Sequence, residues 1–242
     1  MKTLIFAKRN LKELIRDPLS LIFSIGLPIF LLVIFQQFNI PSEVYKLENF
    51  APGIIIFSYG FISLFTGLLI SSDRISSFLT RLYASPMKPL DFIFGYTLAI
   101  IPISIIQSSL LFIVALCLGL EMSINILLCI IFLIPISILF VSLGILIGSS
   151  FSEKTSPGAS SIIVQLVAFT SGMWFDVSTV GNVLGFISRA LPFSYAVDIT
   201  RYILIGEFDK IGKPLLIILI YIVAVYLLSI IVFKKKMVSD NK

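Results

Sequence analysis

The sequence lacks histidine altogether, has only two cysteines, and charged residues make up only 13% of its 242 positions. Histidine is the commonest general base and the commonest metal ligand near neutral pH, so its absence removes both roles together. Cys117 and Cys129 each lie inside an apolar run, where a thiol behaves as a small hydrophobic side chain. No nucleophile beside a base, no zinc-ligand spacing and no paired carboxylates occur either. The sequence therefore predicts neither a catalytic site nor a metal site.

A phosphate-binding loop of the G-x-x-x-x-G-K-[ST] type is also missing. Such a loop needs its glycines and lysine at fixed spacing so that backbone amides and an ammonium group can surround the phosphates. The only Gly-Lys pair is Gly212-Lys213, which is followed by Pro214 and has no glycine five positions before Gly212. We therefore expect no ATP and no other cofactor on this chain.

Hydrophobic residues are plentiful instead, at 58% of the chain. A helix that crosses a bilayer needs about 20 apolar residues, because each residue advances about 1.5 Å through a core about 30 Å thick. Pro102 and Pro135 fall inside two such runs, where proline is tolerated and predicts a kink. The sequence predicts an all-α integral membrane protein with a single transmembrane domain over residues 1–242. Its six predicted spans are residues 19–38, 50–72, 92–119, 123–150, 156–173 and 214–233.

Basic residues exceed acidic residues by 18 to 13, which gives a formal net charge of +5. They are scattered over flanks and loops, a distribution that reports membrane topology, and we expect no nucleic-acid partner. With six spans, thirteen of the 18 basic residues fall on the side that holds both ends of the chain, and five fall on the other. The positive-inside rule therefore predicts that both termini are cytoplasmic. We interpret the Lys234–Lys236 triplet as a stop-transfer anchor, with lipid-specific binding as the alternative.

Residues 4–18 have the spacing of an amphipathic helix. Lys8, Lys12 and Arg16 are one turn apart on one face, while apolar residues recur at three- and four-residue spacing on another. We predict a helix that lies at the cytoplasmic membrane surface. The alternative is a solvated basic leader. The apolar residues are Leu4, Ala7, Leu11, Leu14, Ile15 and Pro18.

Residues 174–213 are too apolar for an ordinary exterior loop, yet their apolar stretches Val183–Ile187 and Ala196–Ile205 are too short to cross a membrane. We predict two short helices that dip into the outer leaflet and return, a re-entrant hairpin broken near Pro192. Asp198 and Arg201 are three residues apart on the second helix and are expected to neutralise each other. A seventh and an eighth span are the alternative.

The centres of the six spans contain no Asp, Glu, Lys or Arg. Carriers driven by protons or sodium usually keep an ionisable or unwound site at mid-membrane, so a driver outside this chain is expected. Gly144 and Gly148 form a G-x-x-x-G motif that permits close approach of helices. Packing within one subunit and dimerisation are both compatible with this motif.

Two local patterns resemble those of the ABC-2 type permease subunits of ATP-driven exporters. The stretch RLYASPMKPLDFIFGY, at Arg81–Tyr96, is similar to the family's connection between its second and third spans, where an arginine and a Ser/Thr-Pro precede the next helix. The stretch LPFSYAVDITRYIL, at Leu191–Leu204, is similar to the family's pattern in the outer hairpin. The order of elements along the whole chain resembles this family too.

The resemblance implies a transport subunit without catalytic activity, located in a bacterial cell membrane. It implies pairing with a second permease, as a homodimer or heterodimer, and docking of a separate ATP-binding subunit that carries ATP and magnesium. A drug, peptide or lipid-like substrate of the multidrug-resistance or bacteriocin-immunity kind is expected to leave the cytoplasm. A glycan-exporting relative, a self-sufficient carrier or channel, and a scaffold that only anchors partners are the alternatives.

Two groups of residues are candidates for functional sites. The connection over residues 76–90 is longer than a simple turn needs, and its apolar helical strip and two proline turns predict a rigid docking element for the ATP-binding subunit. A helix lying on lipid headgroups is the alternative. The docking candidates are Phe78, Leu79, Arg81, Leu82, Tyr83, Ser85 and Pro86, and the candidates for an outer gate are Pro192, Tyr195, Asp198 and Arg201.

Overall fold

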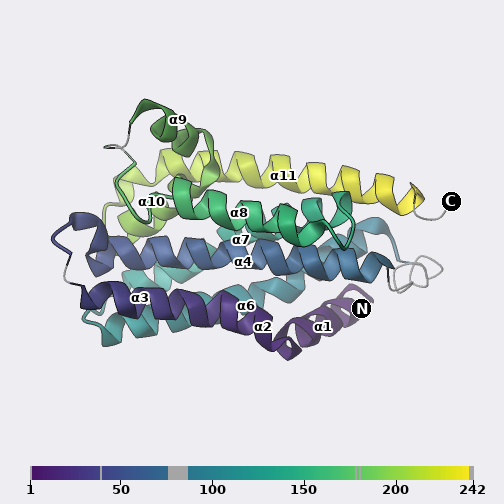
Figure 1. Cartoon of the computed structure of the whole chain (residues 1–242), viewed down its shortest axis with the longest axis horizontal. Coiled ribbons are helices and arrows are strands. Elements are labelled where there is room, and N and C mark those ends of the chain that lie inside the picture. Colours follow the sequence, from purple (N-terminus) through teal and green to yellow (C-terminus); the bar gives the residue numbers. More distant parts are fainter. Residues whose placement is uncertain (1, 39, 76–86, 178, 180, 240–242) are drawn as a thin grey trace.

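The computed structural model describes residues 2–38, 40–75, 87–177, 179 and 181–239. Within these ranges every regular element is a helix. The long helices run side by side along one axis and form a single bundle (Figure 1). The all-α prediction is therefore confirmed.

The chain enters the bundle through four helical pieces that follow one another almost without interruption. The N-terminal helix α1 covers Lys2–Arg16, α2 covers Pro18–Leu21, a π-helical turn covers Ile22–Gly26, and α3 covers Leu27–Gln37. The remaining helices are α4 (Leu47–Ile75), α6 (Pro89–Cys117), α7 (Asn125–Ser150), α8 (Ser156–Thr170), α9 (Asn182–Ala190), α10 (Pro192–Ile205) and α11 (Gly212–Ser239). Single 3-10 turns lie at Glu43–Tyr45 and Phe208–Lys210.

Five described helices are long and apolar enough to cross a membrane: Pro18–Gln37, Leu47–Arg74, Pro89–Cys117, Asn125–Ser150 and Gly212–Lys236. The predicted span at residues 156–173 is shorter than expected, because α8 has only 15 residues. At about 1.5 Å per residue such a helix falls short of the bilayer core. A series of bends at Ser171–Phe175 then leads toward α9.

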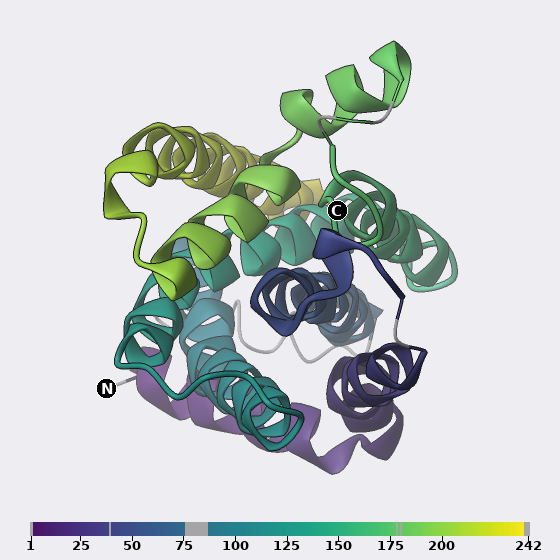
Figure 2. The same ribbon diagram turned by 90° about the vertical axis from the view of Figure 1, so that its left-hand side faces the viewer.

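Helix α4 occupies the middle of the bundle, with α3, α6, α7, α8 and α10 around it (Figure 2). Large apolar side chains along its length, including Phe50, Ile54, Tyr59 and Ile70, are almost completely buried. Helices α9 and α11 lie further from this axis, and α9 projects sideways at one end (Figures 1 and 2). The hydrophobic core of the molecule therefore consists of the side chains packed between α4 and the helices around it.

Helices α4 and α7 share the most extensive helix contact of the described residues, and two glycines allow their close approach. A Cβ atom added to Gly144 would lie 2.6 Å from the Ser63 carbonyl oxygen, and one added to Gly148 would lie 2.5 Å from the Gly67 carbonyl oxygen. Neither position has room for a larger residue without moving the α4 backbone. The G-x-x-x-G motif is therefore occupied by packing within the chain.

Helix α1 packs against α6 and is rotated relative to the face that its sequence predicts. The Phe6 ring meets the rings of Phe92 and Tyr96 edge to face, with centroids 5.4 and 5.0 Å away. Leu4 and Ile15, both predicted on the apolar face, are 63% and 51% exposed. The buried row of α1 follows the aromatic residues of α6, and these two side chains stay on the surface of the bundle. The buried residues of α1 are Phe6, Ala7, Asn10 and Leu14.

A proline shapes the middle of the first long helix. Pro28 has no N–H group, so it cannot donate to the carbonyl of Ser24 four residues earlier. The Gln107 side chain of α6 donates from Nε2 to this carbonyl instead, at 2.7 Å. The π-helical turn at Ile22–Gly26 lies at the same place. A neighbouring helix thus supplies a donor that the first helix lacks.

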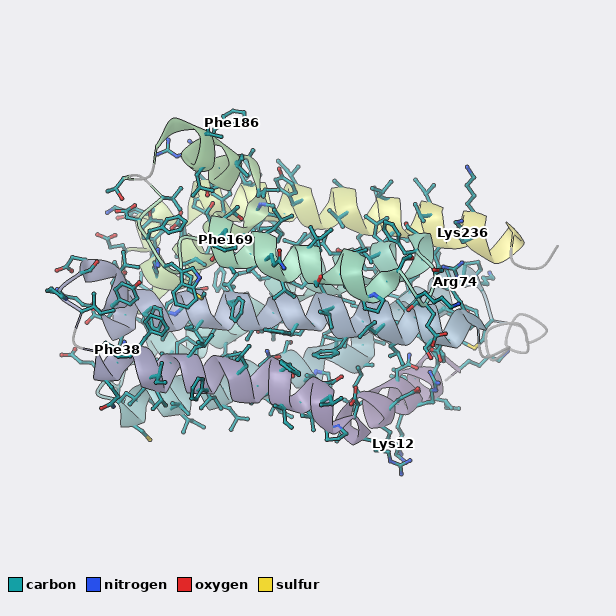
Figure 3. All side chains as sticks on the ribbon, in the orientation of Figure 1. Lys12, Phe38, Arg74, Phe169, Phe186 and Lys236 are labelled. Carbon is teal, nitrogen blue, oxygen red and sulfur yellow. The ribbon has the colours of Figure 1, made fainter. Side chains whose placement is uncertain are left out.

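The two ends of the bundle differ in which segments they hold. Helix α1, the Arg74 end of α4 and the Lys236 end of α11 lie at one end (Figures 1 and 3). The end of α3 near Phe38, the start of α4 and the hairpin α9–α10 lie at the other (Figures 1 and 3). We call these the α1 end and the hairpin end.

Candidate functional site

The hairpin at residues 182–205 is built from two short helices that meet at a proline. Leu191 is extended and Pro192 begins α10, a position where the missing N–H of proline leaves no helical bond unmade. Gly206 has φ of 80° and ends α10 in the left-handed conformation that glycine tolerates. Tyr195 donates from its hydroxyl to the Arg189 carbonyl at 2.9 Å, which ties the start of α10 to the end of α9.

Arg201 joins the hairpin to the body of the bundle. Its Nε atom donates to the Asn49 carbonyl at 3.0 Å, and its Nη2 atom donates to the Gly172 carbonyl at 2.9 Å. Asn49 lies in the first turn of α4, and Gly172 follows α8 with φ of 75°. One guanidinium group therefore holds α10 against the ends of two other helices.

The direct ion pair expected between Asp198 and Arg201 is not formed. No ion pair within contact distance links them among the described residues, because the guanidinium group is directed to the two carbonyls. Burial raises the pKa of the Asp198 carboxyl, while the nearby charge of Arg201 acts in the opposite direction. Burial also lowers the pKa of the Arg201 guanidinium. The two charges influence each other at a distance instead of in contact.

A hollow of about 660 Å³ opens beside these two residues at the hairpin end. Lys210 stands at its edge, paired with Glu207 at 2.8 Å and placed over the Tyr202 ring at 5.8 Å from the centroid. The hollow is lined by charges of both signs and by two tyrosines. Its charged and tyrosine lining residues are Asp176, Arg189, Tyr195, Asp198, Arg201, Tyr202, Asp209, Lys210 and Lys213.

An aromatic cluster holds the segment that follows α8. Trp174 lies 5.0 Å from Phe35 and 6.1 Å from Phe50, measured between ring centroids, and Tyr45 stacks on Phe35 at 5.8 Å. The Tyr45 hydroxyl also donates to the Trp174 carbonyl at 3.2 Å. The segment after α8 is therefore fixed to α3 and α4 by rings, and to α10 by Arg201.

A second polar cluster lies at the α1 end, and sequence reasoning missed it. Arg9 of α1 and the Tyr96 hydroxyl of α6 both donate to Oδ2 of Asp73 in the last turns of α4, at 2.7 and 2.8 Å. The Asp73 side chain is only 3% exposed, and Arg9 also pairs with Glu13 at 2.5 Å. An acidic residue at the end of an otherwise uncharged span, beside Arg74, is the signal that marks this site in the sequence.

Arg74 holds the end of α7 next to the same cluster. Its Nη1 atom donates to the carbonyls of Gly148, Ser149 and Phe151 at 3.0, 2.8 and 3.1 Å. Carbonyls at the end of a helix lack internal donors and carry partial negative charge, so a cation is favourable there. Arg74 therefore binds α4 to α7 beyond their glycine contact.

The predicted docking residues Phe78, Leu79, Arg81, Leu82, Tyr83, Ser85 and Pro86 lie outside the described residues. The two positions that flank them are described, and both are attached to α1. Arg9 holds Asp73 before the segment, and Thr3 donates to Asp91 after it at 3.2 Å. Asp91 also accepts from the backbone N–H of Lys88 at 2.8 Å, at the start of α6. Helix α1 thus links both sides of the predicted docking segment.

These contacts connect helices and contain no catalytic arrangement. Among the described residues, no group of three His, Cys, Asp or Glu side chains could hold a metal ion. What the two clusters can do is mechanical: they fix both ends of α4 to its neighbours.

Comparison with known proteins gives a family. Residues 1–205 match the family model described as ABC-2 type transporter. No curated protein matches the chain.

Proposed function

The chain belongs to the ABC-2 type transporter family, and we propose that it is the permease subunit of an ATP-driven exporter that works with a separate ATPase subunit. Permeases of this family span the membrane and are not themselves catalytic. The proposed substrate is an amphipathic drug, peptide or lipid-like molecule that leaves the cytoplasm. The observation that carries the proposal is the family match over most of the chain.

The proposal of a separate ATPase subunit rests on the sequence. The chain has no G-x-x-x-x-G-K-[ST] loop to bind the phosphates of ATP. The centres of its predicted spans also lack the ionisable residues on which ion-driven carriers depend. We therefore assign ATP and magnesium to a partner chain as part of this proposal.

Residues 76–90 are the proposed docking element, with Arg81 as the main polar contact. Support comes from their flanks, because α1 reaches both of them through the Arg9–Asp73 and Thr3–Asp91 contacts. A displacement of this segment by the ATPase would therefore be shared by α1, α4 and α6. Arg74 extends the connection to α7.

The hairpin α9–α10 is the proposed outer gate, and Pro192, Tyr195, Asp198 and Arg201 remain the residues assigned to it. Helix α4 is 29 residues long, so it carries movement over about 44 Å at about 1.5 Å per residue. The Arg201 bond to Asn49 at the far end of α4 couples that movement to α10. Opening of the gate then requires Arg201 to leave the carbonyls of Asn49 and Gly172.

We further infer that a second permease subunit completes the substrate path. The hollows beside α1 and beside the hairpin lie at the two ends of the bundle, and the middle of α4 is covered by its own neighbours. A substrate path along the bundle axis inside one chain would have to displace the side chains packed around α4. A path between two chains would leave these side chains in place.

Reconstitution tests the proposed function directly. The chain, co-purified with its ATP-binding subunit and placed in liposomes, should move a fluorescent amphipathic substrate only when ATP is present. A catalytically dead ATPase is the control. Transport by the permease alone, driven by an ion gradient, would contradict the proposal and would indicate a self-sufficient carrier.

The docking role of residue 81 has its own test. Arg81→Glu should abolish transport and substrate-stimulated ATP hydrolysis, while expression and membrane insertion stay normal. Lys154→Glu, in the connection between α7 and α8, makes a basic residue acidic outside residues 76–90 and should act more weakly. Full transport by the Arg81→Glu variant, with normal recovery of the ATPase, would exclude this role.

A further inference from the structure

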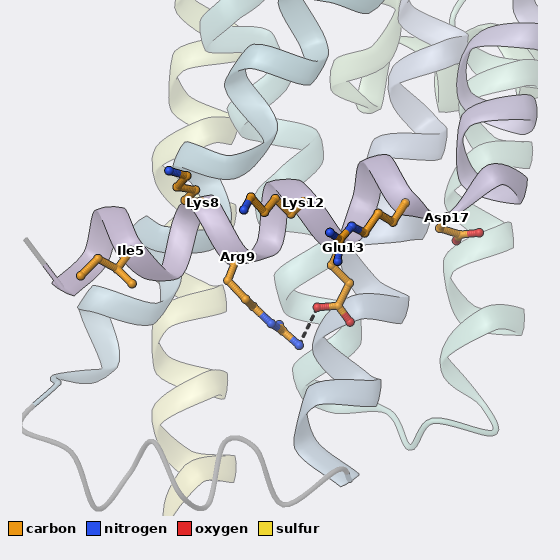
Figure 4. A pocket seen from close by; sticks show the side chains of 7 residues that line it. Ile5, Lys8, Arg9, Lys12, Glu13 and Asp17 are labelled. Carbon is orange, nitrogen blue, oxygen red and sulfur yellow. Dashed lines mark ion pairs between the residues drawn. The ribbon is translucent and has the colours of Figure 1, made fainter.

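The outward face of α1 carries a row of three cations. Lys8, Lys12 and Arg16 are exposed and follow one another at four-residue spacing, so that about 6 Å of helix separates neighbours. They line a shallow hollow of about 580 Å³ together with Ile5, Arg9, Glu13 and Asp17 (Figure 4). In Figure 3, Lys12 projects sideways from the bundle, across its long axis.

The carboxylates next to this row are already engaged. Glu13 pairs with Arg9 at 2.5 Å, as the dashed line in Figure 4 marks. Asp17 accepts from the backbone N–H of Leu19 at 3.1 Å and from the Ser20 hydroxyl. Among the described residues no ion pair reaches Lys8, Lys12 or Arg16. Four cations and two carboxylates line the hollow, so this face keeps a net positive charge.

Apolar side chains share the face with these cations. Leu4, Ile5, Ile15 and Leu19 are 63%, 65%, 51% and 62% exposed. The face continues directly into the first long helix, where Ile22 is also exposed. A face that mixes Lys and Arg with exposed aliphatic residues is typical of a helix at the headgroup level of a membrane.

The roll of α1 about its axis is fixed, which keeps the row outward. Phe6 is packed between rings of α6, and Arg9 is held by the buried Asp73. Phe6 belongs to the buried row of α1, whereas Lys8 and Lys12 are exposed, and Arg9 borders the same hollow as these two cations. The cations therefore cannot turn inward to find a protein partner without breaking these contacts.

We propose that this face is a binding site for anionic phospholipid, with Lys8, Lys12 and Arg16 contacting the phosphate groups. Lysine supplies compact charges, and arginine supplies a fork of N–H donors that fits phosphate oxygens. Ile5, Ile15 and Leu19 contact the glycerol and upper acyl region. A membrane is favoured over a protein partner because the face points sideways and is continuous with the apolar surface of the first long helix. This site does not depend on the proposed transport function.

Native mass spectrometry of the detergent-solubilised full chain tests the site with phosphatidylglycerol and phosphatidylcholine as probes. Phosphatidylglycerol should bind more tightly to the unaltered chain. Each Lys or Arg near a membrane surface contributes about fivefold to the attraction of anionic lipid, so Lys8→Gln/Lys12→Gln/Arg16→Gln should weaken its binding about 100-fold. Binding of phosphatidylcholine should change little.

The matched control removes three charges from the same end of the bundle, as Lys234→Gln/Lys235→Gln/Lys236→Gln. This variant should keep most of the preference for phosphatidylglycerol. If the α1 triple variant does not fold, Lys12→Gln alone should lose about fivefold, and Lys8→Arg/Lys12→Arg should lose nothing.

Four results would overturn the proposal. They are unchanged phosphatidylglycerol binding in the α1 variants, an equal loss in the control triple variant, displacement of the lipid by inorganic phosphate at equal concentration, and loss of a co-purifying ATPase with lipid binding intact. The third would indicate a site for free phosphate, and the fourth a protein-docking face.

Discussion

Asp198 shows how one half-buried charge can set a pH dependence at the hairpin end. Burial raises the pKa of its carboxyl above the ordinary value of 3.8, so the folded state holds the proton more tightly than the unfolded chain does. The ionised carboxylate therefore costs stability above both pKa values, and this cost disappears as the pH falls toward the ordinary value. Arg201 offsets part of the cost from a distance.

Replacement of this carboxylate should consequently stabilise the protein near neutral pH. We expect Asp198→Asn to unfold at a higher temperature than the unaltered chain at pH 7, with the difference closing toward pH 4. Thermal unfolding in detergent between pH 4 and pH 7 measures the difference in unfolding temperature and its dependence on pH. Asp209→Asn, at an exposed position on the rim of the same hollow, should show no such difference. A destabilised Asp198→Asn variant at pH 7 would mean that the interaction with Arg201 outweighs burial.

Asp73 should behave in the opposite way, because its charge is paired in contact. Removal of one partner from a buried ion pair costs about 3–5 kcal/mol, and less here because Arg9 is 33% exposed and keeps Glu13. We expect Asp73→Asn to lower the free energy of unfolding by about 1–3 kcal/mol. Glu13→Gln, which breaks the more exposed pair, should cost less than about 1 kcal/mol. Chemical denaturation in detergent compares the two, and equal losses would contradict a special role for Asp73.

Sequence reasoning found the residues of the hairpin end more readily than their partners. Asp198 and Arg201 stand out because charged residues are rare in this chain, and Pro192 stands out because it interrupts an apolar stretch. The partners of Arg201 are the carbonyls of Asn49 and Gly172, and no residue pattern marks which carbonyl a distant side chain will meet. The sequence suggested an ion pair between Asp198 and Arg201 because they are three residues apart. This prediction was wrong, because the Arg201 guanidinium group reaches the carbonyls of Asn49 and Gly172 instead.

At the scale of elements, the contact of α4 with α7 makes a sharp prediction. Gly148→Ala would place a methyl group 2.5 Å from the Gly67 carbonyl oxygen, so the two helices must separate. Overpacking of this kind lowers the free energy of unfolding by about 1–3 kcal/mol. Gly158→Ala in α8 is the matched control, because nothing lies within 4 Å of its added Cβ. The control should be neutral or slightly stabilising in thermal unfolding, and an equal loss in both variants would refute the close contact.

The long helices were predictable because each one is an apolar run of sufficient length. Helix α8 was not, because the apolar residues continue to Met173 while the helix ends at Thr170, where Gly172 turns the chain with a positive φ. The roll of α1 also escaped prediction. Its apolar residues lie on more than one row, and only the positions of Phe92 and Tyr96 in α6 decide which row is buried.

At the scale of the whole molecule, the arrangement of ends makes the topology testable. Ser42 and Asp209 lie at the hairpin end, and Ser152 follows α7 at the α1 end. In a Cys117→Ser background, single cysteines at Ser42 and Asp209 should react with an impermeant maleimide added outside intact cells. A cysteine at Ser152 should react only after lysis. The reverse pattern would place the termini outside and overturn the predicted orientation.

Pro28 and Gln107 form a pair that should be inherited and altered together. Gln107 donates to the Ser24 carbonyl, to which Pro28 has no N–H to donate. The stability that Gln107 contributes therefore depends on the presence of Pro28. Gln107→Leu should lower the free energy of unfolding of the unaltered chain by about 1 kcal/mol, which is the net contribution of a typical hydrogen bond. In a Pro28→Ala background, where the first helix regains an N–H at this position, the same substitution should lower it by clearly less. A double-mutant cycle measures this non-additivity. Selection would then tolerate the loss of either residue more easily after the other had changed, so the order of substitution matters at this crossing of α6 with the first helix.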